Sequence, residues 1–172
     1  PLWNNGNYYD QEKQPTESLA LAMQMMNVAA FHAGFFERTY PRETMKDQEN
    51  LESVTGQTTF EKALNAVVMQ TVPYTDLNHW IYTCRMCINY DVSRPYGGDL
   101  DKALSRIRAK VLAVPCRQDA LHPWEFITWV TDRINTLGGN AASYILDSDY
   151  GHMAGILRTD LFAEKVREFL DN

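Results

Sequence analysis

Asp119 and His152 are the two residues of this sequence whose side chains could most readily do chemistry together. A carboxylate beside an imidazole fixes the ring tautomer and stabilises the protonated ring, so the histidine can take a proton from a serine or cysteine. Each residue lies in a loop that follows an apolar, strand-like run. Because ligands of parallel sheets bind beyond the carboxyl ends of the strands, we expect the two side chains to meet there. The residues alone leave a second interpretation open, in which Asp119 begins a turn and His152 is an ordinary loop histidine.

The elements that would position this pair alternate between strands and helices. The run VLAVPC at residues 111–116 is typical of a strand buried on both faces, and residues 142–147 predict a second strand. Residues 124–137 between them predict an amphipathic helix, and residues 160–170 predict a last one. This order indicates a doubly wound α/β sheet, in which strands joined by a crossover helix tend to be neighbours.

The first hundred residues have a helical pattern without alternating strands. Helices are predicted from Thr16 and from Asp76, each a possible N-cap, and over residues 59–69, with a polar connection at residues 37–58. We therefore expect residues 1–100 to form a helical lid and residues 101–172 to form the C-terminal strands and helices of the core. One face of the first helix is predicted to be core or interface through Leu19, Met23, Met26 and Ala30.

Composition limits the class of protein. The chain has 172 residues, 45% of them hydrophobic, and a net charge of -6, which suits one globular domain and disfavours nucleic acid as a partner. The sequence has no apolar run of about 18 residues and no signal peptide, so neither a membrane span nor export is expected. Three cysteines fit a reducing cytoplasm. The start at Pro1 predicts a processed or truncated product.

Other residues with reactive side chains carry weaker signals. Cys84 and Cys87 form a lone CRMC without a second ligand pair, so buried structural thiols are favoured over metal or redox work, and no metal site is expected. His122 is interpreted as a packing or rim residue. The remaining candidates are interpreted as structural or solvent-facing residues: His32, His79, Arg94 and Arg117.

Several segments resemble the homoserine O-acetyltransferase family. SDYGHMAG at residues 148–155 resembles its final motif, S-x-Y-G-H-D-A-F, and VPCRQDALHP at residues 114–123 resembles its acid loop. Residues 3–9 and 75–82 resemble the helical lid of that family, so the resemblance covers essentially the whole chain. It implies the C-terminal portion of an α/β-hydrolase fold with a helical lid insertion, in which Asp119 and His152 are the acid and base of a catalytic triad.

The resemblance also implies an activity. Members of the family pass an acetyl group from acetyl-CoA to a hydroxyl through an acyl-serine, which requires no bound cofactor besides the acyl donor. It further implies small-molecule substrates, a role in methionine biosynthesis, a cytoplasmic location and a homodimer formed through the lid.

The sequence departs from the family in two places. No G-x-S-x-G element is present, so the nucleophilic serine is expected on an N-terminal half outside these residues, and this chain alone is expected to be inactive and poorly soluble or oligomeric. Met153 replaces the aspartate that follows the family's histidine, which leaves the acceptor undetermined. Two alternatives stay open: an esterase or thioesterase on the same scaffold, and a non-catalytic fragment.

Overall fold

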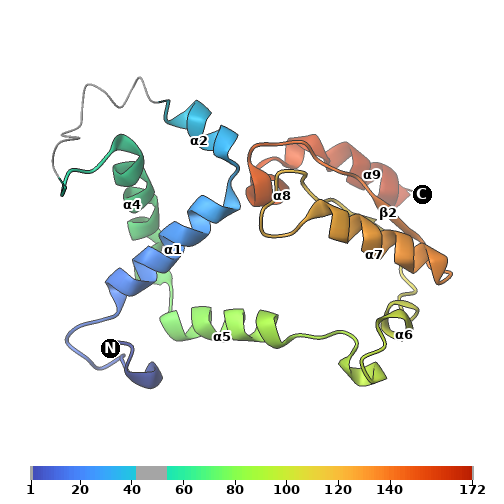
Figure 1. Ribbon diagram of the computed structural model, residues 1–172, viewed down its shortest axis with the longest axis horizontal. Coiled ribbons are helices and arrows are strands. Elements are labelled where there is room, and N and C mark those ends of the chain that lie inside the picture. Colours follow the sequence, from blue (N-terminus) through green and yellow to red (C-terminus); the bar gives the residue numbers. More distant parts are fainter. Residues whose placement is uncertain (1, 42–53, 172) are drawn as a thin grey trace. The chain divides into compact units, whose positions relative to one another are not determined.

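The computed structural model describes residues 2–41 and 54–171, which divide into two compact units (Figure 1). The first unit comprises Pro1–Val28 and Glu37–Tyr90, and the second comprises Ala29–Phe36 and Asp91–Asn172. Most of the predicted polar connection, residues 42–53, lies outside the described residues.

Helices α1 (Thr16–Ala30), α4 (Thr59–Thr71) and α5 (Leu77–Asn89) supply most of the first unit. A short helix, α2 (Ala33–Thr39), was not predicted separately. The core of the unit joins α1 to the end of α4 and the start of α5, through Leu19, Ala20, Met23, Val68, Val72, Leu77 and Trp80. The three predicted helices are therefore confirmed.

Of the two predicted N-caps, one is confirmed and the other is not. Asp76 caps α5 as predicted, because its side chain accepts a hydrogen bond from the backbone amide of His79. Thr16 is the first residue of α1 and not its N-cap. The predicted core or interface face of α1 is buried at Leu19, Met23 and Ala30, whereas Met26 is 46% exposed, which leaves the interface alternative for that residue.

The second unit is built on two parallel strands, β1 (Val111–Ala113) and β2 (Ala141–Ser143), joined by the crossover helix α7 (Trp124–Thr136). The predicted parallel neighbours are confirmed, with Val111 paired to Ala141. Both strands are shorter than predicted. Pro115 has no amide hydrogen to continue the ladder, and an isolated parallel bridge between Cys116 and Leu146 resumes the pairing beyond it.

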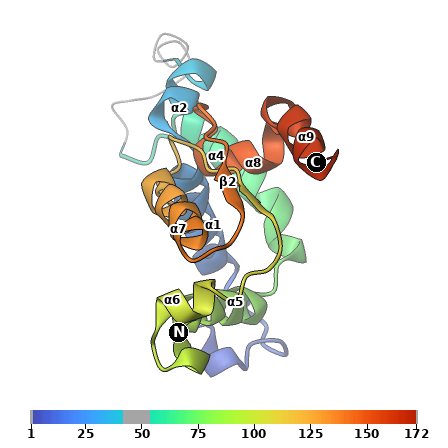
Figure 2. The ribbon, with the colours of Figure 1, turned by 90° about the vertical axis from the view of Figure 1, so that its right-hand side faces the viewer.

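Helices cover the two faces of this sheet. Figure 2 shows α7 on one side of β2, and α8 (Ala154–Leu157) and α9 (Ala163–Asp171) on the other. The α7 side packs around Leu104 of α6 (Leu100–Leu104), Ile134 and Ala141, and the opposite side packs around Cys116, Leu146 and Ala154. β1 is half-buried and not fully buried as predicted, since β2 is its one neighbouring strand in the described residues.

Polar contacts fix α7 against β2 and so fix where β2 ends. The Asn135 side chain accepts a hydrogen bond from the amide of Ala141 at 2.7 Å and donates one to its carbonyl at 2.8 Å. The hydroxyls of Thr131 and Ser143 lie 2.7 Å apart. These contacts set the register of the strand that leads to His152.

The last helix starts later than predicted. Residues Thr159–Leu161 form a 3-10 turn, and α9 begins at Ala163. The guanidinium of Arg158 and the carboxylate of Asp160 pair across this turn, at 2.8 Å. Asp160 thus closes a turn instead of beginning the helix.

No single helix in the described residues is both long and apolar enough to cross a bilayer; α1 and α2 meet the length and composition requirement only when taken together across a sharp bend.

Candidate active site

The loops that carry Asp119 and His152 leave the sheet side by side. The bridge between Cys116 and Leu146 is the last pairing of the two strands, and both loops follow it directly. A hydrogen bond of 2.9 Å from the amide of Arg117 to the carbonyl of Leu146 continues the alignment by one residue. The carboxyl ends of β1 and β2 therefore lead both loops to the same edge of the sheet.

Asp119 and His152 meet at this edge. Nδ1 of His152 lies 3.0 Å from Oδ2 of Asp119, a hydrogen-bond distance. The side chain of Asp119 is only 10% exposed, whereas that of His152 is 34% exposed. The predicted proximity is confirmed, and the pair has a buried carboxylate behind an imidazole that solvent can reach.

Backbone amides hold the Asp119 carboxylate in place. Its Oδ1 accepts hydrogen bonds from the amides of Leu121 at 2.8 Å and His122 at 2.9 Å, which leaves Oδ2 for the histidine. Burial acts to raise the pKa of Asp119, but the hydrogen bonds from His122, His152 and Leu121 outweigh it, and the pKa lies below the ordinary aspartate value. The carboxylate is therefore ionised at neutral pH.

Gln118 connects the two loops from the residue before Asp119. Its side-chain oxygen accepts a hydrogen bond of 2.9 Å from the amide of Ser148, and its side-chain nitrogen donates to the Asp147 carboxylate. The thiol of the buried Cys116 donates to the carbonyl of Ser148 at 3.3 Å. These contacts tie the acid loop to the start of the histidine loop.

Gly151 places His152 through a close backbone approach. Its φ is +54°, and a Cβ at this position would lie 2.9 Å from the carbonyl oxygen of Ala30 and 3.1 Å from that of Gln118. The amide of His32 donates to the carbonyl of Asp149 at 3.0 Å, which holds the neighbouring segment in the same place. Only glycine fits both the left-handed backbone and the space.

His122 lies closer to the pair than the sequence indicated. Its Nδ1 is 3.2 Å from Nδ1 of His152, and the two rings are stacked with their centroids 5.0 Å apart. Its side chain is 64% exposed, so it lies at the rim as predicted, but it contacts the site instead of packing elsewhere. The sequence held one indication of this contact, since His122 comes three residues after Asp119 and so lies in the turn that this aspartate closes.

A cavity of about 270 Å³ opens beside the pair. The lining combines apolar residues from the strand end and α7 with the polar trio, and consists of Val114, Pro115, Cys116, Asp119, His122, Ile127, His152 and Gly155. Among the described residues, one group has the atoms to hold a metal ion: Asp119, His122 and His152.

Comparison with known proteins identifies relatives that match essentially the whole of this chain. A homoserine O-acetyltransferase from Geobacter metallireducens is 28% identical over 99% of this chain and 45% of its own length. The crystal structure of homoserine O-acetyltransferase from Bacillus anthracis superposes with a TM-score of 0.88 and 37% identity, over 100% of this chain and 45% of that one. The chain is a homologue of the homoserine O-acetyltransferases.

The fold of this homoserine O-acetyltransferase homologue is that of an α/β-hydrolase. The crystal structure of esterase E22 has the same fold, with a TM-score of 0.85 and 24% identity over 98% of this chain and 45% of that one. No family model matches the chain. The chain spans less than half the length of the curated relatives that it matches, which is consistent with the predicted C-terminal half.

The other residues with reactive side chains that the sequence singled out in the homologue are not part of the pair formed by Asp119 and His152. Cys84 and Cys87 are exposed on α5, so the prediction of buried thiols is wrong; the core contacts of α5 come from Leu77 and Trp80 in its first turn. His32 is structural as predicted, since its Nδ1 accepts a hydrogen bond from the amide of Gly34. Arg117 lies over the ring of Trp124, 4.5 Å from its centroid.

Two further predicted residues have no place in the site. His79 is exposed, and its backbone amide is the one capped by Asp76. Arg94 begins the 3-10 turn Arg94–Tyr96. Neither contributes an atom to the lining of the cavity beside Asp119.

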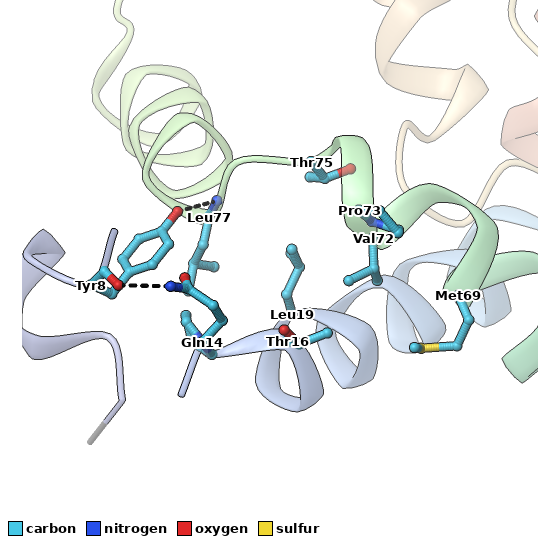
Figure 3. Close-up of a pocket in the computed structure, with 10 residues that line it drawn as sticks. Tyr8, Gln14, Thr16, Leu19, Met69, Val72, Pro73, Thr75 and Leu77 are labelled. Carbon is cyan, nitrogen blue, oxygen red and sulfur yellow. Dashed lines mark hydrogen bonds between the residues drawn. The ribbon is translucent and has the colours of Figure 1, made fainter. Parts of the chain in front are cut away.

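A second cavity lies within the first unit. Figure 3 shows it between the N-terminal segment, α1 and the end of α4, with a volume of about 330 Å³. The Tyr8 hydroxyl at its edge accepts a hydrogen bond from the amide of Leu77 at 2.9 Å, and Gln14 donates to the Tyr8 carbonyl at 3.0 Å. Its lining, largely apolar, has no acid–base pair.

Proposed function

We propose that the full-length protein transfers an acetyl group from acetyl-CoA to a hydroxyl acceptor, with Asp119 and His152 as the acid and base of a catalytic triad. The observation that carries the proposal is the 3.0 Å contact between Nδ1 of His152 and Oδ2 of Asp119 beside a cavity. The names of the relatives, homoserine O-acetyltransferase, support the reaction class.

The geometry suits a histidine that accepts protons at Nε2. When Nδ1–H donates to the ionised Asp119, the ring has its free lone pair on Nε2, and the carboxylate stabilises the ring when Nε2 is protonated. The buried carboxylate is fixed by two amides, so it can hold the ring without moving. His152 is thereby oriented for general base catalysis.

The reaction proceeds in two acyl transfers. A serine supplied by residues outside this chain loses its proton to Nε2 of His152 and attacks the thioester carbonyl, and the CoA sulfur leaves with that proton. The acceptor hydroxyl then loses its proton to the same nitrogen and attacks the acyl-serine. The new ester leaves, and the serine oxygen takes the proton back from His152.

Met153 favours a second candidate function, hydrolysis of an ester or thioester. The residue directly follows His152, and a thioether cannot pair with the ammonium group of an amino alcohol. An acceptor without that charge, or water, would not need a carboxylate at this position. Both candidates use the same pair, and they differ only in the group that attacks the acyl-serine.

Other features of the proposal follow from the relatives' names and from the first unit. We infer a small-molecule alcohol as acceptor, a role in methionine biosynthesis and a cytoplasmic enzyme. We also infer a homodimer formed through the helical lid, because Met25 and Met26 of α1 are 67% and 46% exposed.

The test incubates the full-length protein with acetyl-CoA alone, with homoserine and with uncharged alcohols. The proposal predicts that CoA release accelerates with at least one alcohol and that the acetyl ester of that alcohol accumulates, as measured by mass spectrometry. CoA release that no alcohol accelerates, with acetate as its co-product, would establish the hydrolase instead. Absence of any CoA release in the folded protein would exclude both acetyl transfer from acetyl-CoA and hydrolysis of this thioester.

A further inference from the structure

We propose that Asp119, His122 and His152 form a binding site for a divalent ion of the zinc class, and that the bound ion switches off the acid–base pair. The site itself stands on geometry. Its regulatory effect rests on the function proposed above.

The three ligand atoms already have the spacing of a coordinated ion. Nδ1 of His122 and Nδ1 of His152 are 3.2 Å apart, Nδ1 of His152 and Oδ2 of Asp119 are 3.0 Å apart, and Nδ1 of His122 and Oδ2 of Asp119 are 3.9 Å apart. Zinc bonds of about 2.0–2.2 Å to nitrogen and oxygen place tetrahedral ligand atoms about 3.3 Å from one another. An ion could therefore reach all three atoms with side-chain shifts of a few tenths of an ångström.

The chemistry of the set points to zinc and related ions. Two imidazole nitrogens and one carboxylate oxygen form a mixed nitrogen and oxygen set, which suits zinc better than calcium or magnesium. The single carboxylate leaves the bound ion with one net positive charge. The cavity beside the trio leaves the fourth coordination position open to water.

The backbone around Asp119 pre-organises the set. Oδ1 of Asp119 is held by the amides of Leu121 and His122, so the outward Oδ2 is the oxygen that remains for an ion. The amide bond from His122 also fixes the backbone of the second ligand relative to the first. The close backbone approach at Gly151 positions His152, the third ligand. Little conformational freedom would be lost on binding.

Occupation of this site is incompatible with base catalysis by His152. An ion on Nδ1 displaces the hydrogen bond to Asp119, and the neutral ring then has its proton on Nε2. That nitrogen is the atom that must accept the proton of the nucleophile. The ring proton moves between the two nitrogens through solvent, with no net proton released. The metal-bound protein is therefore expected to be an inactive form.

The binding test uses cobalt(II) as the probe on the full-length protein, after dialysis against a chelator. Tetrahedral cobalt absorbs visible light, so the titration reports geometry as well as stoichiometry, and zinc added afterwards should displace it. We expect one cobalt ion per chain. His122→Asn should weaken binding at least about 100-fold, because even the loss of an outer partner of a ligand costs about 10- to 100-fold.

Two more variants keep the binding test decisive. His122→Phe retains an aromatic ring beside His152 and should lose the ion equally, with a melting temperature measured to show that the fold is intact. His79→Asn removes an exposed histidine on α5 and should bind cobalt like the original protein. No tetrahedral spectrum, or equal affinity in the folded His122→Phe protein, would overturn the site.

The proposed inhibition is tested by measuring CoA release in the presence of zinc and then after addition of excess chelator. We expect reversible inhibition in the original protein and none in His122→Phe at the same zinc concentration. Binding without inhibition would overturn the switch. If the protein shows no acyl transfer at all, the proposed function fails while the cobalt titration still decides the site.

Discussion

The side-chain oxygen of Gln118 accepts a hydrogen bond of 2.9 Å from the backbone amide of Ser148. This contact joins the loop that carries Asp119 to the loop that carries His152, one residue before the acid and four before the base. Gln118 is thus a positioning residue, since it sets the separation of two loops without contacting the reacting atoms.

Gln118→Ala should lower the stability of the full-length protein by about 1–3 kcal/mol, because the amide of the buried Ser148 loses its partner. It should also lower kcat more than it raises KM, as the pair loses its alignment. Urea unfolding and steady-state kinetics measure the two effects. Gln70→Ala, at an exposed position of α4, is the control. Equal kcat in the two variants would refute the positioning role.

Gly151→Ala should destabilise the protein by about 1–3 kcal/mol and reduce activity. The added methyl group meets the Ala30 carbonyl at 2.9 Å, and the φ of +54° disfavours any side chain. Gly155→Ala is the matched control, because a Cβ there has no atom within 4 Å. The comparison of unfolding free energies is decisive: similar losses in both variants would contradict the close approach.

The stability of the protein should depend on the ionisation of Asp119. Its pKa is lowered in the folded state, so the ionised carboxylate contributes stability above the unfolded value of about 3.9, and this contribution disappears as the pH falls through the folded pKa. Urea unfolding of the original protein and Asp119→Asn from pH 7 to pH 3 should show a difference in free energy that shrinks below about pH 4. A difference that does not change with pH would be inconsistent with the lowered pKa.

Met153→Asp should change the choice of acceptor. A carboxylate next to His152 could pair with the ammonium group of homoserine, and a pair worth about 1.4 kcal/mol changes kcat/KM about tenfold. We expect the ratio of kcat/KM for homoserine to that for an uncharged alcohol to rise by about that factor. Met153→Asn, which adds polarity without charge, should leave the ratio unchanged. The same ratio in all three proteins would place the acceptor away from this residue.

Strand pairing and the meeting of Asp119 with His152 could be predicted because local patterns and general topology rules fix them. The apolar runs before each loop and the helical pattern between them indicate parallel neighbours, and neighbours bring their following loops together. Asp76 caps α5 for the same local reason. The roles of Asp119 and His152 as acid and base came from the resemblance of their loops to a known family.

The features that could not be predicted from the sequence depend on packing and on the direction of side chains. The exposure of Cys84 and Cys87 depends on which residues of α5 pack on the core of the unit, and those are Leu77 and Trp80 in its first turn, which helical spacing does not specify. The contact between His122 and His152 depends on a turn that Asp119 closes with its own side chain. The close approach at Gly151 could not be predicted either, because the nearest atom that a Cβ there would meet belongs to Ala30, more than a hundred residues earlier.

The most direct test of the acid–base pair is a single-turnover measurement of acetyl-enzyme formation from acetyl-CoA by the full-length protein. We predict that Asp119→Asn and His152→Asn each slow acetylation about 10³- to 10⁴-fold, and that the double variant is no slower than the slower single variant. When two residues act as one unit, removal of either one already abolishes their joint contribution to the rate, so removal of the second costs little more. Single variants that acetylate at the original rate, or a double variant whose loss is the product of the two, would contradict the pair.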